Sequence, residues 1–125
     1  MIRGVVTNHL EAWVDLAVVG DGLPTVNFSA VIDTGFSDFL TLPIAVLERF
    51  RAVPVTHVIV TLADGSEIVS EVFELTVLWD GVPITIDVHA AEVEPLVGMA
   101  LLAGHDLHMR VVPNGEVTIA VVPDA

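Results

Sequence analysis

The sequence predicts a single, mainly β domain. Four dipeptides that favour tight hairpin turns are spread along the chain, each between runs rich in Val, Ile, Leu and Thr: Asp21-Gly22, Asp64-Gly65, Asp80-Gly81 and Asn114-Gly115. Between the turns, apolar and polar residues alternate, as expected for strands with one buried face. Because 125 residues with 54% hydrophobic content suffice for one core, we expect one domain over residues 1–125.

The clearest strand pattern follows the third of these turns. Apolar residues there occupy alternate positions, so that one face carries Val82, Ile84, Ile86 and Val88. Helical pattern appears only in two short segments, residues 43–51 and residues 98–103, each about two turns long. Elements of this kind predict a β architecture with two short helices.

The charge balance excludes several partners. The chain has 17 acidic residues, four arginines and no lysine, for a formal net charge of -13, so nucleic acids and anionic membranes are poor partners. A well-solvated acidic surface is the simplest interpretation of this excess. No cysteine is present, which excludes disulfides, thiol nucleophiles and thiolate metal sites.

The chain is expected to be soluble and cytoplasmic. No uncharged stretch approaches the roughly 18 residues that span a bilayer, and Glu11 interrupts the apolar run after Arg3 too early for a signal peptide.

The segment Val31-Ile32-Asp33-Thr34-Gly35 carries the strongest functional signal. Two β-branched apolar residues lead into an aspartate, a hydroxyl and a glycine, which places one carboxylate at the end of a strand. An apolar segment with Leu42-Pro43 follows it, and Leu96-Val97-Gly98 comes later, with Gly98 65 positions after Asp33.

Together these motifs resemble the retroviral-type (retropepsin-like) aspartic proteases, and most closely their small bacterial and archaeal branch. The resemblance covers nearly the whole chain and implies a closed, barrel-like β fold that works as a two-fold homodimer. It also implies an endopeptidase that acts on peptides or unfolded proteins, with Asp33 from each subunit as the catalytic pair and with no cofactor or metal. A pair is needed because one carboxylate must act as a base toward water while the other donates a proton to the scissile carbonyl.

The resemblance assigns roles to the residues around Asp33. Thr34 is expected to bond across the dimer axis, the amide of Gly35 to donate to the catalytic carboxylate, and Ser37 to support that carboxylate from behind. Phe36 stands where retroviral enzymes usually have alanine. Asp38 adds a further acid, which can equally be a solvated surface residue.

Three further segments complete the expected site. The hairpin tip Ala63-Asp64-Gly65 is the candidate flap over a bound peptide, although an ordinary exposed hairpin has the same pattern. Val97 and Gly98 are expected to pack beneath the active-site loop. The apolar chain ends are expected to interleave in an intersubunit sheet, with pairing inside one chain as the alternative.

The histidines and tryptophans are given no functional role. His105 and His108, with Asp106 between them, lack a third convincing metal ligand, so no metal site is predicted. Trp13 and Trp79 lie on expected strands and are interpreted as core residues. The competing functional interpretation is a non-catalytic dimer that keeps the fold and binds peptides or partner proteins.

Overall fold

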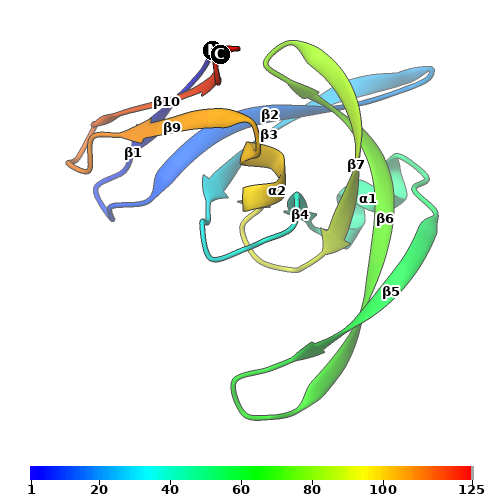
Figure 1. The fold of residues 1–125 in the computed structure, drawn as a ribbon. Helices are drawn as coiled ribbons and strands as arrows, with labels where there is room; N and C mark the ends of the chain where they lie inside the picture. The colour runs from blue at the N-terminus through cyan, green and yellow to red at the C-terminus, as the bar shows by residue number, and fades with distance from the viewer. Residues whose placement is uncertain (125) are drawn as a thin grey trace.

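A computed structural model describes residues 1–124, so the domain expected over residues 1–125 extends one residue beyond the described part. Ten strands and two short helices lie in that part (Figure 1). In chain order these are β1 (Ile2–Val6), β2 (Ala12–Gly20), β3 (Leu23–Ile32), β4 (Leu40–Leu42), α1 (Ile44–Arg49), β5 (Pro54–Thr61), β6 (Glu67–Trp79), β7 (Val82–Ala90), β8 (Leu96–Val97), α2 (Met99–Leu102), β9 (His105–Met109) and β10 (Glu116–Val121). The mainly β class predicted from the turn signals is confirmed.

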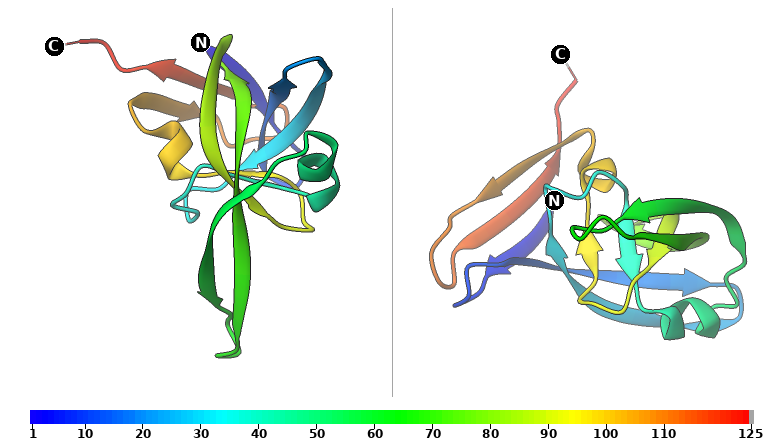
Figure 2. Two further views of the ribbon diagram at one scale, coloured as in Figure 1. Left: turned by 90° about the vertical axis from the view of Figure 1, so that its right-hand side faces the viewer. Right: turned by 90° about the horizontal axis from the view of Figure 1, so that it is seen from below.

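All ten strands belong to one sheet, which closes on itself only in part. Its order is β5-β6-β7-β4-β8-β3-β2-β1-β10-β9, and an additional pairing of β6 with β2 joins six of the strands in a ring. Strands β1, β10 and β9 extend the sheet beyond the ring on one side, and β5 extends it on the other (Figures 1 and 2). The expected closed barrel is therefore present only as this six-stranded ring.

The four turn dipeptides lie between consecutive strands, as the sequence predicts. Asp80 and Gly81 form a two-residue turn between β6 and β7, and both have positive φ angles, 52° and 76°. That geometry is the one that favours Asp-Gly in hairpins, because its twist matches the twist of the strands. Gly22, Gly65 and Asn114 also have positive φ, at the turns β2–β3, β5–β6 and β9–β10.

The apolar face expected on β7 is buried only in its second half. Ile86 and Val88 are buried, Ile84 is half-buried, and Val82 is 57% exposed. Val82 lies at the turn end of the hairpin, which extends past the ring, so alternation alone did not show where burial stops.

The chain ends pair with each other, which makes the expected interleaved intersubunit sheet wrong for this chain. Strand β1 lies between β2 and β10, with Ile2 opposite Ile119 and Val5 opposite Glu116. Strand β10 lies between β1 and β9, so each terminal strand is hydrogen-bonded on both edges over part of its length. The alternative, pairing within one chain, holds, and the open edges of the sheet are those of β5 and β9.

Both predicted helices are present and short. Helix α1 has Pro43 as its N-cap, where a missing N–H costs nothing, and the first amide inside it, of Ile44, donates to the Glu92 carboxylate at 2.9 Å. Helix α2 has four residues and follows Gly98. In the part of the chain that the structure describes, no helix is long and apolar enough to cross a membrane.

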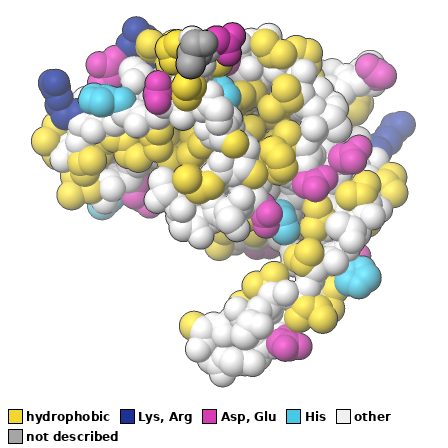
Figure 3. Space-filling model, viewed as in Figure 1, with side chains coloured by type: hydrophobic (Ala, Val, Ile, Leu, Met, Phe, Trp, Pro, Cys, Tyr) yellow, Lys and Arg dark blue, Asp and Glu magenta, His cyan; other side chains and the backbone are white. Residues whose placement is uncertain are grey.

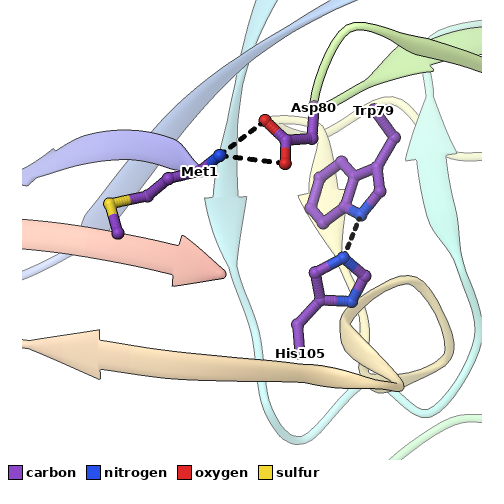
Figure 4. A network of polar contacts seen from close by, with 4 residues as sticks. All are labelled: Met1, Trp79, Asp80 and His105. Carbon is purple, nitrogen blue, oxygen red and sulfur yellow. Dashed lines mark hydrogen bonds and ion pairs between the residues drawn. The ribbon is translucent and has the colours of Figure 1, made fainter. Parts of the chain in front are cut away.

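A polar contact joins two strands that are distant in the sequence, β6 and β9. The Trp79 indole N–H donates to Nε2 of His105 at 3.3 Å, and the two rings meet edge to face at 5.8 Å (Figure 4). Nδ1 of His105 lies 2.9 Å from the Ala103 carbonyl, so the neutral imidazole that fits both contacts carries its proton on Nδ1. Beside them, the amino group of Met1 bonds both Asp80 carboxylate oxygens at 2.8 and 2.9 Å.

We expect Trp79→Phe to lower the free energy of unfolding by about 2 kcal/mol, because it removes a buried hydrogen bond and part of a buried ring. Trp13→Phe is the matched control, since the buried indole nitrogen of Trp13 has no hydrogen-bond partner among the described residues. Urea unfolding measures the loss in free energy of unfolding for each variant. An equal loss in both would show that the hydrogen bond to His105 does not contribute to stability.

Candidate active site

The carboxylate of Asp33 lies at the point where two strands that are distant in sequence run side by side. Strand β3 ends at Ile32, which pairs in parallel with Val97 of β8, and the Asp33 amide donates to the Val97 carbonyl at 2.9 Å. Asp33 is half-buried, whereas Thr34 is exposed. The backbone that leads into the carboxylate is therefore fixed by the sheet.

The Asp33 carboxylate is held by the backbone of its own loop. The amide of Gly35 donates to Oδ1 at 2.9 Å, and among the described residues no other hydrogen bond reaches this carboxylate. Gly35 does not need positive φ here; instead, a Cβ at this position would lie 3.2 Å from Oδ1 and crowd it. The side chain of Ser37 is exposed and makes no hydrogen bond to Asp33 in this structure, so its supporting role stays a prediction.

The segment after β8 packs directly behind this loop. A Cβ at Gly98 would lie 2.1 Å from the Asp38 carbonyl oxygen and 2.6 Å from the Phe36 ring, distances that only a glycine permits. The amide of Gly98 donates to the Phe39 carbonyl at 3.0 Å, and that of Met99 to the Phe36 carbonyl at 2.8 Å. These contacts define the shape of the loop that presents Asp33.

A histidine side chain also contacts this loop. Nε2 of His89, on β7, lies 3.2 Å from Oδ2 of Asp38, and the imidazole meets the Phe36 ring edge to face at 6.0 Å. The two side chains that depart from the retroviral pattern, Phe36 and Asp38, thus share one partner. Sequence reasoning assigned His89 no role, because only the parallel pairing of β4 with β7 brings it to the loop.

The candidate flap forms a long, exposed arm. Every residue of β5 is exposed, and the hairpin extends away from the rest of the molecule (Figures 1 and 2). Apolar side chains lie on its surface as well (Figure 3), among them Ile59 and Val69, which are 65% and 67% exposed. An isolated two-stranded ribbon with so much exposed apolar surface is marginally stable on its own.

The tip of the arm, Ala63-Asp64-Gly65, is closed by short polar contacts. Asp64 Oδ1 accepts hydrogen bonds from the amide of Ser66 at 2.9 Å and from its hydroxyl at 2.5 Å. These bonds lower the pKa of Asp64 below its ordinary value. The carboxylate therefore supports the turn above the ordinary aspartate pKa and loses this role as the pH falls through its own lower pKa.

An open cavity of about 410 Å³ borders Asp33 on the side of the β1–β2 turn. Most of the residues that line it are apolar, and the lining also includes two acidic residues, Asp33 and Glu11. No sequence pattern indicates that Glu11 belongs to the site, since the sheet alone brings the two residues to one cavity.

The structure does not bring the remaining polar candidates to Asp33. His105 contacts Trp79, and His108 lies on β9 opposite Thr118 of β10. Within residues 1–124, no three histidine or acidic side chains are grouped so that they could hold a metal ion.

Comparison with known proteins supports the fold. No protein-family model and no curated protein matches this sequence. Among solved structures, the chain is similar to a retropepsin-like aspartic protease from Rickettsia conorii, with a TM-score of 0.61, 15% sequence identity, and coverage of 97% of this chain and 91% of that chain. At this identity the likeness shows a retropepsin-like fold and nothing about activity.

Proposed function

We propose that this chain is an aspartic endopeptidase that cleaves peptides or unfolded proteins as a homodimer, with Asp33 of each subunit in a shared catalytic pair. The observation that carries the proposal is the state of Asp33: a half-buried carboxylate on a strand end, fixed through one oxygen by the Gly35 amide, in a retropepsin-like fold. Its other oxygen has no hydrogen-bond partner among the described residues, so it can accept one from water.

The need for a second subunit follows from the chemistry. Each chain holds one Asp-Thr-Gly segment, and Thr34 beside the carboxylate is exposed, as an interface residue of the free subunit would be. When two carboxylates approach to about 3 Å, both cannot stay ionised, so the two share one proton.

In the proposed reaction, the ionised Asp33 takes a proton from a water molecule, whose oxygen attacks the scissile carbonyl carbon. The partner subunit's Asp33, which is protonated, donates a proton to the carbonyl oxygen, and a gem-diol intermediate forms. The intermediate collapses as the first Asp33 gives its proton to the amine nitrogen, the C–N bond breaks, and the partner subunit's Asp33 takes a proton from a gem-diol hydroxyl. The β5–β6 arm is proposed to cover the peptide, and its backbone amides to pair with the peptide backbone.

The proposal is tested with wild type, Asp33→Asn and the control Asp87→Asn, which removes an exposed acid of β7. Each is incubated with a mixture of unstructured peptides from about pH 4 to 7.5, and new termini are identified by mass spectrometry. We expect wild type and Asp87→Asn to cleave, and Asp33→Asn to be slower by roughly 10³-fold or more.

Two results would contradict the proposal. Equal cleavage by wild type and Asp33→Asn would exclude Asp33 as the catalytic group. Absence of cleavage by wild type, with a dimer confirmed by sedimentation at high salt, would favour the non-catalytic peptide-binding module; high salt is needed because two subunits of charge -13 repel each other.

A further inference from the structure

The cavity beside Asp33 is lined mostly by apolar residues and by one acidic residue that the proposed reaction does not use. Its volume of about 410 Å³ is enough for one long side chain, and its walls include Val31, Leu96, Met109 and Val111. Glu11 lines the same cavity. Among the described residues, no hydrogen bond or ion pair involves the Glu11 carboxylate.

The backbone that carries Glu11 is fixed by the turn between β1 and β2. The Thr7 amide donates to the Glu11 carbonyl at 2.9 Å, and the Glu11 amide contacts the Thr7 hydroxyl at 3.3 Å. Leu10, between them, has a φ of 59°, a conformation that leucine rarely adopts. Glu11 is half-buried in this arrangement, and its backbone is held in place by the turn.

A cavity lined mostly by apolar residues, with an acidic residue whose backbone is held in place, fits a side chain with an aliphatic stem and a cationic end. Lysine and arginine have this form, because their methylene groups cover apolar surface while the head group bonds a carboxylate. A neutral apolar side chain would leave Glu11 half-buried without a partner, and an acidic one would be repelled by both Glu11 and Asp33. The net charge of -13 further favours the approach of cationic groups.

We propose that this cavity binds a lysine or arginine side chain, and that Glu11 recognises its positive charge. That the side chain belongs to a peptide cut at Asp33 rests on the proposed function, whereas binding of the cation does not. The cavity thereby defines a substrate class: peptides with a basic residue close to the scissile bond.

The test uses two small probes of equal shape, n-butylguanidinium and the uncharged n-butylurea. Amide NMR shifts of the residues that line the cavity are followed as each probe is titrated into wild type, Glu11→Gln, Asp33→Asn and Asp87→Asn. The last variant is the matched control, because it changes the net charge by the same amount at an exposed site on β7, outside the lining of the cavity.

We expect wild type and Asp87→Asn to bind n-butylguanidinium roughly tenfold more tightly than n-butylurea. Glu11→Gln should remove most of this difference, and Asp33→Asn should remove less of it. Equal binding of both probes by wild type, no shift of the lining residues, or a preference that survives Glu11→Gln would overturn the proposal.

Cleavage sites separate this inference from the proposed function. If wild type cleaves peptides, Lys or Arg should be enriched at one position near the cut, and Glu11→Gln should reduce cleavage of those peptides roughly tenfold relative to versions with norleucine at that position. Loss of the enrichment in Asp87→Asn as well would assign it to net charge and overturn the role of Glu11. If the chain binds n-butylguanidinium through Glu11 but cleaves nothing, the cation site stands and the proposed function fails.

Discussion

Gly98→Ala is expected to destabilise the fold by about 3 kcal/mol or more, because the new methyl group would overlap backbone that cannot move freely. Its Cβ would lie 2.1 Å from the Asp38 carbonyl oxygen, and the loop that contains Asp38 is also hydrogen-bonded to the first amides of α2. Relief of the overlap requires either β8 or the active-site loop to shift. Chemical denaturation of the purified variant measures the cost.

Gly104→Ala is the control for this prediction. Gly104 has a φ of 79°, and a Cβ at this position would meet no heavy atom within 4 Å, so the substitution adds only backbone strain of about 1–2 kcal/mol. If Gly98→Ala cost no more than Gly104→Ala, the close packing of β8 against the loop would be unimportant for stability.

Addition of a tenfold excess of Asp33→Asn chains to wild type is expected to lower the activity per wild-type chain roughly tenfold. Random exchange of subunits would leave about one wild-type chain in eleven with a wild-type partner, and a mixed dimer holds only half of the catalytic pair. Peptide cleavage is measured after the mixture has equilibrated at high salt, where the acidic subunits repel each other least.

The same excess of Asp87→Asn chains is the matched control, because those chains keep Asp33 and should form active mixed dimers. Activity per wild-type chain that does not change in the Asp33→Asn mixture would mean that each chain works without a partner's carboxylate. That result would remove the shared pair from the proposal.

Local features of this fold could be predicted from the sequence because their causes are local. An Asp-Gly pair favours its turn through backbone angles that involve only those residues, and Pro43 begins α1 for a similar reason. The position of Asp33 at a strand end follows from the apolar, β-branched residues before it. Nothing distant in the chain is needed for these conclusions.

Pairings between distant segments could not be predicted in this way. Whether β1 pairs with β10 of its own chain or of another depends on the path of the whole sheet, and the two outcomes require the same β-branched composition. The contact of His89 with Asp38 and the cavity shared by Glu11 and Asp33 have the same origin. In each case, residues with no sequence pattern in common meet because strands far apart in the chain lie side by side.

The two halves of strand β6 lie in different environments. Its second half, which includes Phe73, Val77 and Trp79, is buried in the ring, whereas its first half forms the arm with β5 and adds almost nothing to the core. Substitutions in the outer arm therefore carry little penalty for folding. Under the proposed function the arm covers the substrate, so substitutions in the arm can change that contact without first compensating for lost stability.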